Sequence, residues 1–310
     1  MKQIVLFGAS KLGEIAFDLL NSEYQIIYYC DNNSDIWGKR LNNIEILSPS
    51  RLKEIKGNYE VIITSMYLKE IELQLVNELN ILNYKFFSMN ISSTMNGKGY
   101  LNRDWVLENA KKYGDIELFL ESLGNKVGRT KRVLDKISEV IDWNLVESVC
   151  EIGPGSGIFT RRVIEAQPNL SNYMIYEPDV AWVEWIVKNF DVTRRIANGA
   201  SLEFEEDQTM SLVHAHAVFV YLNPIDCFAY FREMIRVTKS GGYIIFDFLA
   251  LEGLDSNAID GWLISGHRFP QFISERVIRE FFIVNGALLI GEFKEEYAND
   301  FVNYHIYQVQ

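Results

Sequence analysis

Seven residues decide the fold, Glu151-Ile152-Gly153-Pro154-Gly155-Ser156-Gly157, because they place a glycine-rich loop between a buried strand and a helix. The apolar run Val149–Ile152 leads into the loop, and apolar residues at helical spacing follow it in Phe159–Ile164. Glycine adopts positive φ and lets the backbone come close to a ligand. Amides at the start of a helix then face a negative group. This segment therefore predicts an α/β domain with a binding loop.

An acidic residue ends the next expected strand, Tyr173–Glu177. A carboxylate at that position, here Glu177, can accept hydrogen bonds from both hydroxyls of a ribose. A GxGxG loop alone is a weak signal, but here a strand, a helix and this acid accompany it. The four features together predict a site for a ligand that contains a ribose.

The alternation of strands and helices continues to the end of the chain. Apolar runs predict further strands at Ser211–Ala215 and Tyr243–Phe248. Ala287–Phe293 and Tyr304–Val309 are expected to form an antiparallel pair. This half of the chain is therefore expected to hold one continuous sheet.

Residues 148–310 resemble the class I S-adenosylmethionine-dependent methyltransferases. The glycine loop matches the first motif of that family, and Glu177 matches its ribose-binding acid. Ser211–Val218 resembles the fourth strand and its exit, and Met234–Tyr243 resembles the turn into the fifth. The resemblance implies a seven-stranded sheet with an antiparallel last strand and S-adenosyl-L-methionine as the cofactor.

The resemblance also assigns cofactor contacts to single residues. Glu177 is expected to bind the ribose, Asp179 to lie beside the adenine with Val180, and His216 to lie near the sulfonium end with Ala217. The methionine part is expected to be surrounded by Glu151, Gly153, Gly155 and Gly157.

One position departs from the family pattern. The family places an aspartate before the fourth strand, where it bonds the adenine amino group, and Gly199 stands there in this chain. Either the Ala200 backbone or Asn198 replaces that aspartate, or adenine binds more weakly.

The chemistry of methyl transfer requires the acceptor to be aligned, and a hydroxyl acceptor often needs a base. His214 and His216 are expected to face opposite sides of the fourth strand, and His216, nearer the carboxyl edge, is the first candidate for catalysis or for positioning alone. His267 is an alternative base, and Arg268 can clamp a phosphate or carboxylate. Both lie in residues 251–270, an insertion that covers the acceptor or is a plain surface lid.

The first ninety residues predict a second, smaller parallel βα unit. Four strands are expected, at Ile4–Phe7, Gln25–Cys30, Val61–Thr64 and Tyr84–Phe87, with a helix over Ile71–Leu82. The fold class is thus α/β with two Rossmann-like domains.

Three segments are expected along the chain: a nucleotide-binding-type domain at 1–92, helical lead-in segments at 93–147, and the methyltransferase domain at 148–310. Asn90–Gly99, rich in Ser, Asn and Gly, is expected to be the linker.

The first unit has its own loop, Gly8-Ala9-Ser10-Lys11-Leu12-Gly13, and its own acid, Asp31, after the second strand. With the stretch Asp31–Arg40 it resembles the N-terminal nucleotide-binding domain of bacterial acetyltransferases that act on UDP-sugars. The resemblance implies nucleotide contacts from Gly8, Ser10, Lys11, Asp31 and Asn32. The unit then binds a nucleotide-linked sugar, or is a scaffold or dimerisation module, or binds a dinucleotide for redox chemistry.

Composition and charge limit the classes of partner that the chain is expected to bind. The net charge of −12 and the absence of a clustered basic stretch disfavour a nucleic-acid substrate. Cys30, Cys150 and Cys227 lie far apart without ligand spacing, which predicts buried free thiols and no metal site. Apolar runs are too short for a membrane span, and the N-terminus lacks the pattern of a signal peptide. A cytoplasmic protein is expected, with a homodimer left open.

The sequence therefore favours a small-molecule O-methyltransferase that acts on a sugar or nucleotide-linked sugar in surface-polysaccharide biosynthesis. Two alternatives remain open at this point. One is a non-catalytic, regulatory nucleotide-binding protein in which Gly199 marks a lost cofactor site, and the other is a protein methyltransferase.

Overall fold

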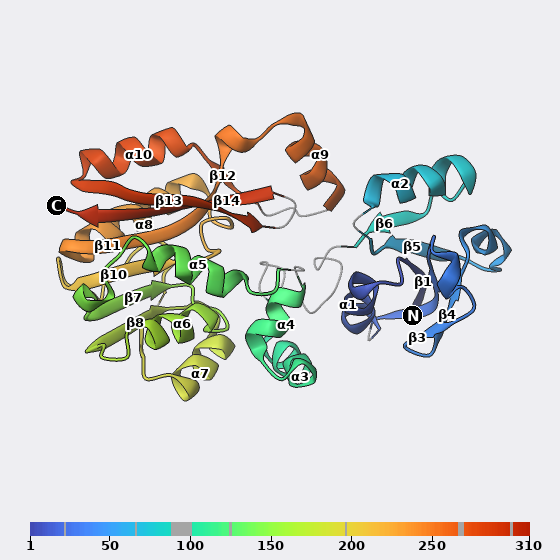
Figure 1. Ribbon diagram of the computed structural model, residues 1–310, viewed down its shortest axis with the longest axis horizontal. Helices are drawn as coiled ribbons and strands as arrows, with labels where there is room; N and C mark the ends of the chain where they lie inside the picture. The colour runs from blue at the N-terminus through green and yellow to red at the C-terminus, as the bar shows by residue number, and fades with distance from the viewer. Residues whose placement is uncertain are drawn as a thin grey trace. The chain divides into compact units, whose positions relative to one another are not determined.

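The computed structural model describes residues 1–21, 23–65, 67–87, 101–123, 126–195, 197–265, 270–297 and 300–310. The chain divides into two compact units, Met1–Asn102 with Asp260–Arg268, and Arg103–Ile259 with Phe269–Gln310. Figure 1 shows that each unit is built around its own sheet. The linker expected at Asn90–Gly99 lies outside the described residues.

The sheet of the first unit has the strand order β3-β4-β2-β1-β5-β6. Neighbouring strands are parallel except β3 and β4, which form an antiparallel hairpin. The four expected strands are confirmed, whereas the hairpin was not predicted. Its strands are short, and only two residue pairs join β4 to β2. The bounds are β1 (Lys2–Phe7), β2 (Tyr24–Cys30), β3 (Arg40–Leu41), β4 (Ile44–Leu47), β5 (Tyr59–Ile63) and β6 (Tyr84–Phe86).

The helices of this unit are α1 (Lys11–Leu20) and α2 (Leu68–Leu73), with a π-helical turn, η3 (Gln74–Glu78), following α2. A helix is present where one was expected, but the expected bounds, Ile71–Leu82, were wrong. It begins one turn earlier and ends before Asn80, whose φ of 56° does not continue a helix. η1 (Ser34–Ile36) and η2 (Pro49–Glu54) are short 3-10 helices.

The sheet of the second unit runs β13-β14-β11-β10-β7-β8-β9, with β12 paired beside β11 as an eighth strand. β14 is antiparallel to both of its neighbours, as expected for the last strand. The short strands β9 and β12 were not predicted. The bounds are β7 (Ser148–Ile152), β8 (Asn172–Tyr176), β9 (Thr193–Arg195), β10 (Met210–Ala215), β11 (Thr238–Ala250), β12 (Phe272–Ile273), β13 (Ala287–Tyr297) and β14 (Asp300–Val309).

Helices cover both faces of this sheet. On one face Phe231 of α8 (Pro224–Val237) and Phe282 of α10 (Glu275–Val284) pack against Phe246 of β11. The opposite face lies under α5 (Arg129–Ser138) and α6 (Ile158–Ala166), and Phe159 of α6 packs onto it. Further elements of the unit are α3 (Arg103–Tyr113), α4 (Ile116–Leu123), η5 (Trp143–Leu145), α7 (Val180–Asn189) and η6 (Leu251–Gly253), whereas α9 (Ser256–Ser265) is divided between the two units at Asp260.

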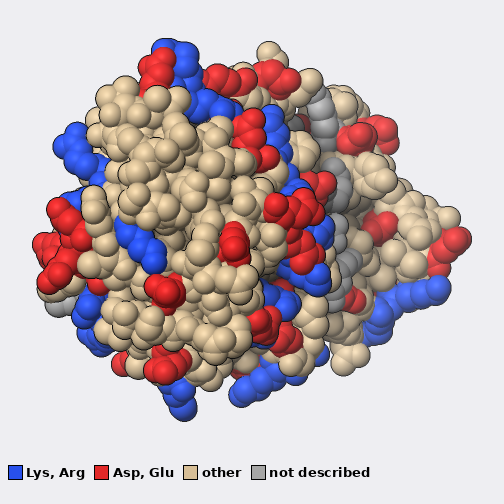
Figure 2. Space-filling model, turned by 60° about the vertical axis from the view of Figure 1, so that its left-hand side comes forward, with Lys and Arg blue, Asp and Glu red and all other residues tan. Residues whose placement is uncertain are grey.

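In the segment 93–147, expected to be helical, the described residues form three separate helices and a 3-10 turn. All three cysteines are free and buried, as predicted. On the face drawn in Figure 2, acidic and basic side chains are interspersed. No helix of the described ranges is long and apolar enough to cross a membrane.

Candidate functional site

The glycine loop continues β7 and leads directly into α6. The amide of Gly153 donates to the carbonyl of Tyr176 at 2.8 Å, so the loop starts as an extension of the β7–β8 pairing. A Cβ on Gly153 would lie 2.6 Å from Cγ2 of Val218, so packing alone excludes a side chain there. Gly155 also has positive φ, but a Cβ on it would meet no atom within 4 Å. The backbone at Gly155 is therefore the part of the loop that a ligand can approach.

Glu177 joins this loop to the end of β8. Its side chain is buried, Oε2 accepts the amide of Gly155 at 2.8 Å, and Oε1 accepts the amide of Asp179 at 2.9 Å. Burial raises the pKa of the carboxyl group, and the two amides oppose that rise. Each carboxylate oxygen can accept a second hydrogen bond. The arrangement therefore fits the two hydroxyls of a ribose.

Asp179 is the N-cap of α7. Its Oδ1 accepts the amides of Ala181 at 2.9 Å and Trp182 at 3.3 Å, as an aspartate at that position does. Its side chain thus shapes the edge of the expected adenine region, and its contact with adenine stays a prediction.

Glu151 lies in β7 beneath the loop and is 2% exposed. Its Oε2 accepts the hydroxyls of Thr160 at 2.6 Å and Tyr173 at 2.8 Å, while Oε1 has no hydrogen-bond partner among the described residues. Burial raises the pKa of this carboxyl group to about 7, against the two hydroxyl donors. An acid in this state fits a positively charged amino group, which would return it to the ionised form.

The segment expected to replace the family's adenine-binding aspartate forms a compact turn. Oδ1 of Asn198 accepts the amides of Ala200 at 3.0 Å and Ser201 at 2.8 Å. The amide of Ala200 and the side chain of Asn198 thus bond each other. Their part in adenine binding stays a prediction.

The expectation that His214 and His216 face opposite sides of β10 was wrong. Residues two apart on a strand point to the same side, and the ring centroids of the two histidines lie 5.1 Å apart. His214 is buried against Tyr173, whose hydroxyl lies 3.0 Å from Nε2. Nδ1 of His214 has no partner among the described residues. Burial lowers the pKa of His214 to about 3, so the ring is neutral near pH 7.

His216 follows the last residue of β10, at the carboxyl edge where it was expected. It is 8% exposed and stacks on Phe159, with the ring centroids 3.6 Å apart. Its Nδ1 lies 3.3 Å from the hydroxyl of Tyr304. Burial lowers its pKa well below the usual value, helped by the positive charge of Arg129. The two other candidates for catalysis, His267 and Arg268, lie outside the described residues.

The residues that sequence reasoning missed at this edge are Asp247 and Tyr304. Asp247 is fully buried on β11, where Oδ1 accepts the amide of Ala217 at 2.6 Å and Oδ2 lies 3.7 Å from Nη2 of Arg129. The signal was present in the sequence, because an aspartate interrupts the otherwise apolar run Tyr243–Ala250. A charge at the centre of a buried strand needs a specific reason.

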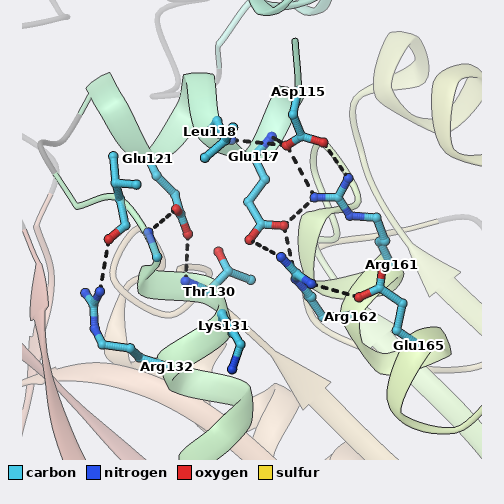
Figure 3. A network of polar contacts seen from close by, with 12 residues as sticks. Asp115, Glu117, Leu118, Glu121, Thr130, Lys131, Arg132, Arg161, Arg162 and Glu165 are labelled. Atoms are coloured by element: carbon cyan, nitrogen blue, oxygen red, sulfur yellow. Dashed lines mark hydrogen bonds and ion pairs between the residues drawn. The ribbon is translucent and has the colours of Figure 1, made fainter. Parts of the chain in front are cut away.

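The lead-in helices are attached next to the loop by ion pairs (Figure 3). Glu117 of α4 is 4% exposed and pairs with Arg161 and Arg162 of α6, and Asp115 pairs with Arg161 at 2.8 Å. Hydrogen bonding to Arg161 lowers the pKa of Asp115. Arg103, at the start of α3, donates to the carbonyl of Ala181 in α7 at 3.1 Å. The lead-in helices therefore bond the first turns of both helices that flank the candidate site.

The loop of the first unit repeats the pattern seen at Glu177. Asp31 accepts the amide of Ala9 at 2.7 Å through Oδ2 and the amide of Asn33 at 2.8 Å through Oδ1. In both units, therefore, an acid after the second strand bridges an amide of the first loop and the amide two residues ahead. Gly8, with a φ of 129°, bonds the carbonyl of Cys30 through its amide.

The other residues expected near this nucleotide site have different surroundings. Ser10 is the N-cap of α1 without a side-chain bond to the helix, and Asn32 donates to Gln74 at 3.0 Å. The side chain of Lys11 is not described. Of the described side chains expected to contact the nucleotide, that of Asp31 bonds the backbone of the loop.

One further group of side chains has the composition of a metal site. Glu275, Glu292 and His305 place their ligand atoms within 4.8 Å of one another. Arg279 bonds both carboxylates, so its guanidinium supplies a positive charge among them. The prediction that the chain has no metal site stays a prediction.

Comparison with known protein families gives two matches. Residues 1–87 match a family model described as "C2185-like, N-terminal", and residues 150–246 match one described as "Methyltransferase domain". The resemblance of the first unit to sugar acetyltransferases is not confirmed by that match. No curated protein matches the chain.

Solved structures similar to this chain include several methyltransferases. An O-methyltransferase family protein from Burkholderia thailandensis has 12% identity and a TM-score of 0.48, over 66% of this chain and 63% of that one. Magnesium protoporphyrin IX methyltransferase from Synechocystis PCC 6803, with bound SAM, has 13% identity and a TM-score of 0.47, over 61% and 83%. A methyltransferase from Clostridium acetobutylicum has 12% identity and a TM-score of 0.48, over 65% and 99%.

The methyltransferase match begins at Cys150 and covers the glycine loop, Glu177 and the whole of β10. It therefore coincides with the residues whose geometry suits a ribose and an amino group. The chain is an enzyme with a methyltransferase domain at residues 150–246.

Proposed function

We propose that the second unit methylates a hydroxyl group of a small molecule, and that this molecule is a sugar or nucleotide-linked sugar used in surface-polysaccharide biosynthesis. The observation that carries the cofactor part is the bridge that Glu177 makes between the loop amide of Gly155 and the start of α7. The proposed cofactor contacts come from Glu151, Gly153, Gly155, Gly157, Glu177, Asp179, Ala200 and His216.

Different residues around the loop contact different parts of the cofactor. Glu151 receives the amino group through Oε1, the amides at the start of α6 receive the carboxylate, and Glu177 receives the ribose. When bound, S-adenosylmethionine supplies a methyl carbon that is electrophilic because it is attached to a positively charged sulfur.

The remaining chemistry belongs to the side chains at the end of β10. A hydroxyl acceptor must lose its proton as it attacks, and the neutral imidazole of His216 is the proposed acceptor at this edge, although burial lowers its pKa and so makes it a weaker base. His267 and Arg268 remain proposed acceptor contacts from the insertion at 251–270.

The first unit supports the acceptor class. Asp31 is held between Ala9 and Asn33 as Glu177 is held between Gly155 and Asp179, so the two units offer comparable carboxylates for a ribose. The proposed contacts are Gly8, Ser10, Lys11, Asp31 and Asn32. A nucleotide held there would raise the effective concentration of its sugar for the second unit.

The cofactor assignment is tested by calorimetric titration with S-adenosylmethionine. Binding is expected for the wild type, and Glu177→Ala should weaken it roughly 10-fold or more, because two ribose hydroxyls lose a charged acceptor. Glu184→Ala, an exposed residue of α7, serves as the control and should bind normally. Absence of binding at millimolar cofactor would favour the regulatory alternative.

The acceptor class is tested by thermal-shift measurements with UDP-, GDP- and CDP-sugars, with and without S-adenosylhomocysteine. One nucleotide class is expected to raise the melting temperature, and Asp31→Ala should remove that shift while leaving the shift by S-adenosylhomocysteine in place. No shift with any sugar nucleotide would contradict the acceptor proposal and leave the first unit as a scaffold.

A further inference from the structure

Three buried polar side chains stand side by side on neighbouring strands next to the glycine loop. Asp247 of β11 is directly opposite Tyr304 of β14. His216 follows Ala215 of β10, whose partner is Phe246, so it stands beside Asp247. All three are at most 8% exposed. A polar row of this kind is costly to bury unless its hydrogen bonds are satisfied together.

The hydrogen-bond count of this row leaves one oxygen without a donor. The amide of Ala217 serves Oδ1 of Asp247 at 2.6 Å, while Oδ2 has no hydrogen-bond partner among the described residues. Two side chains interact with this carboxylate: Arg129, whose Nη2 lies 3.7 Å from Oδ2, and Tyr304, whose hydroxyl is directed at the Asp247 side chain. Because a tyrosine hydroxyl rotates freely, Tyr304 can point its proton at Oδ2.

The direction in which the Tyr304 hydroxyl proton points determines which ring nitrogen of His216 carries the hydrogen. The hydroxyl oxygen of Tyr304 lies 3.5 Å from Nη2 of Arg129, which donates to it, and 3.3 Å from Nδ1 of His216. A hydroxyl has one proton, so if it is given to Asp247, the oxygen can only accept from His216. Nδ1 must then carry the hydrogen, which leaves the lone pair on Nε2.

We propose that Tyr304 is a positioning residue whose hydroxyl, oriented by Asp247 and Arg129, keeps the hydrogen of His216 on Nδ1 and leaves Nε2 to accept a proton. The use of Nε2 in methyl transfer rests on the proposed function, whereas the choice of tautomer does not. When an acceptor hydroxyl gives its proton to Nε2, its O–H bond breaks, the electron pair stays on the oxygen, and His216 becomes an imidazolium.

The packing around the row supports this assignment. Phe159 stacks on the His216 ring with centroids 3.6 Å apart, and Phe293 stacks on Tyr304 with centroids 4.8 Å apart, so both rings are packed against an aromatic neighbour. Burial keeps His216 neutral. Because the His216 ring is packed and neutral, the property that its hydrogen bonds still determine is its tautomer. The buried aspartate has the same effect on the histidine of a serine-protease triad.

The tautomer can be read without any activity, by nitrogen NMR of the free full-length protein labelled at histidine. The chain has 4 histidines, and His216→Gln identifies the signals of His216. In the wild type Nδ1 is expected to carry the hydrogen. Asp247→Asn should reverse this, because the Ala217 amide holds the asparagine oxygen at the Oδ1 position and leaves its NH2 group facing Tyr304. The hydroxyl proton then turns to Nδ1, and the hydrogen of His216 moves to Nε2.

A matched control removes a hydroxyl from the same strand. Tyr307 is fully buried on β14 and bonds Nδ1 of His305 at 2.9 Å, so Tyr307→Phe should change the signals of His305 alone. Tyr304→Phe should release His216 into a mixture of tautomers. If Tyr304→Phe does not fold, as judged by circular dichroism, the nearly isosteric Asp247→Asn carries the test.

The outcomes separate this proposal from the proposed function. Hydrogen on Nε2 of His216 in the wild type, or an unchanged tautomer in Asp247→Asn, would overturn the role of Tyr304 even if S-adenosylmethionine binds. If the tautomers behave as expected and the enzyme is active, Asp247→Asn should lower kcat on the order of 100-fold, with the affinity for S-adenosylmethionine unchanged. Expected tautomers without cofactor binding would sink the proposed function and leave the hydrogen-bond assignment intact.

Discussion

At the residue scale, the surroundings of Glu151 change the pKa of its carboxyl group. Burial raises the pKa of its carboxyl group to about 7, the hydroxyls of Thr160 and Tyr173 oppose this, and the charge of Glu177 adds to it. Because the pKa in the folded protein is above that of an unfolded glutamate, the folded state holds the proton more tightly. The associated stability is present below about pH 4.5 and is lost as the pH rises through 7.

This shift predicts a pH-dependent affinity for the cofactor. A positively charged amino group beside Glu151 favours the ionised carboxylate, so binding near pH 7 should release about half a proton. The affinity should increase from pH 6 to pH 8. Calorimetry in two buffers of different ionisation enthalpy measures the release, which Glu151→Gln should abolish and the exposed control Glu165→Gln should not. Binding without proton release at pH 7 would show that no amino group meets Glu151.

At the scale of elements, the candidate site depends on how α4 is attached to α6. Glu117 of α4 is almost fully buried between Arg161 and Arg162, which are themselves 28% and 30% exposed. A buried carboxylate with two arginines stabilises this attachment more than a surface pair does, although solvent around the arginines weakens it. The arrangement also holds α3 near α7, through Arg103.

Replacing the carboxylate of Glu117 is expected to lower the stability of the folded protein. Glu117→Gln should lower the free energy of unfolding by roughly 1–2 kcal/mol, since two arginines lose a shared charged partner. The melting temperature should fall by about 2–8 °C. Glu165→Gln is the matched control, because Glu165 pairs with Arg162 from an exposed position, and it should change the free energy by less than about 0.5 kcal/mol. An equal effect of both changes would contradict the buried role of Glu117.

At the scale of the whole molecule, each unit has a hydrophobic core of its own. The first core gathers buried side chains of β1 and β5 with Leu52 and Leu75. The second gathers side chains of β10 and β11 with α8 and α10, including Phe231 and Phe282. Because each core is complete within its unit, each unit can unfold cooperatively.

Two transitions are therefore expected in scanning calorimetry, and S-adenosylhomocysteine should raise only one of them. At 100 times its dissociation constant the ligand adds about 2.7 kcal/mol, which corresponds to a shift of roughly 5–10 °C. Glu177→Ala should remove this shift without moving the other transition. A single transition, or an equal shift of both, would show that the units unfold together.

The sequence by itself determined the elements whose cause is local. The glycine loop, Glu177, the central strands of both sheets and the antiparallel last strand follow from apolar periodicity, turn residues and a short spacing between motifs. The shared face of His214 and His216 also follows from the two-residue period of a strand, although the expectation stated otherwise. Short strands such as β9 have too few residues for a periodic signal.

Only the tertiary structure decided which polar groups meet. Tyr304 reaches His216 across 88 positions of the chain, and Glu117 reaches Arg161 across 44. The burial that gives Glu151 its raised pKa likewise comes from residues on other elements. Such contacts depend on strand order, register and helix packing, which bring distant segments together. Sequence periodicity describes one segment at a time, so it indicates a binding edge without showing which side chains bond each other there.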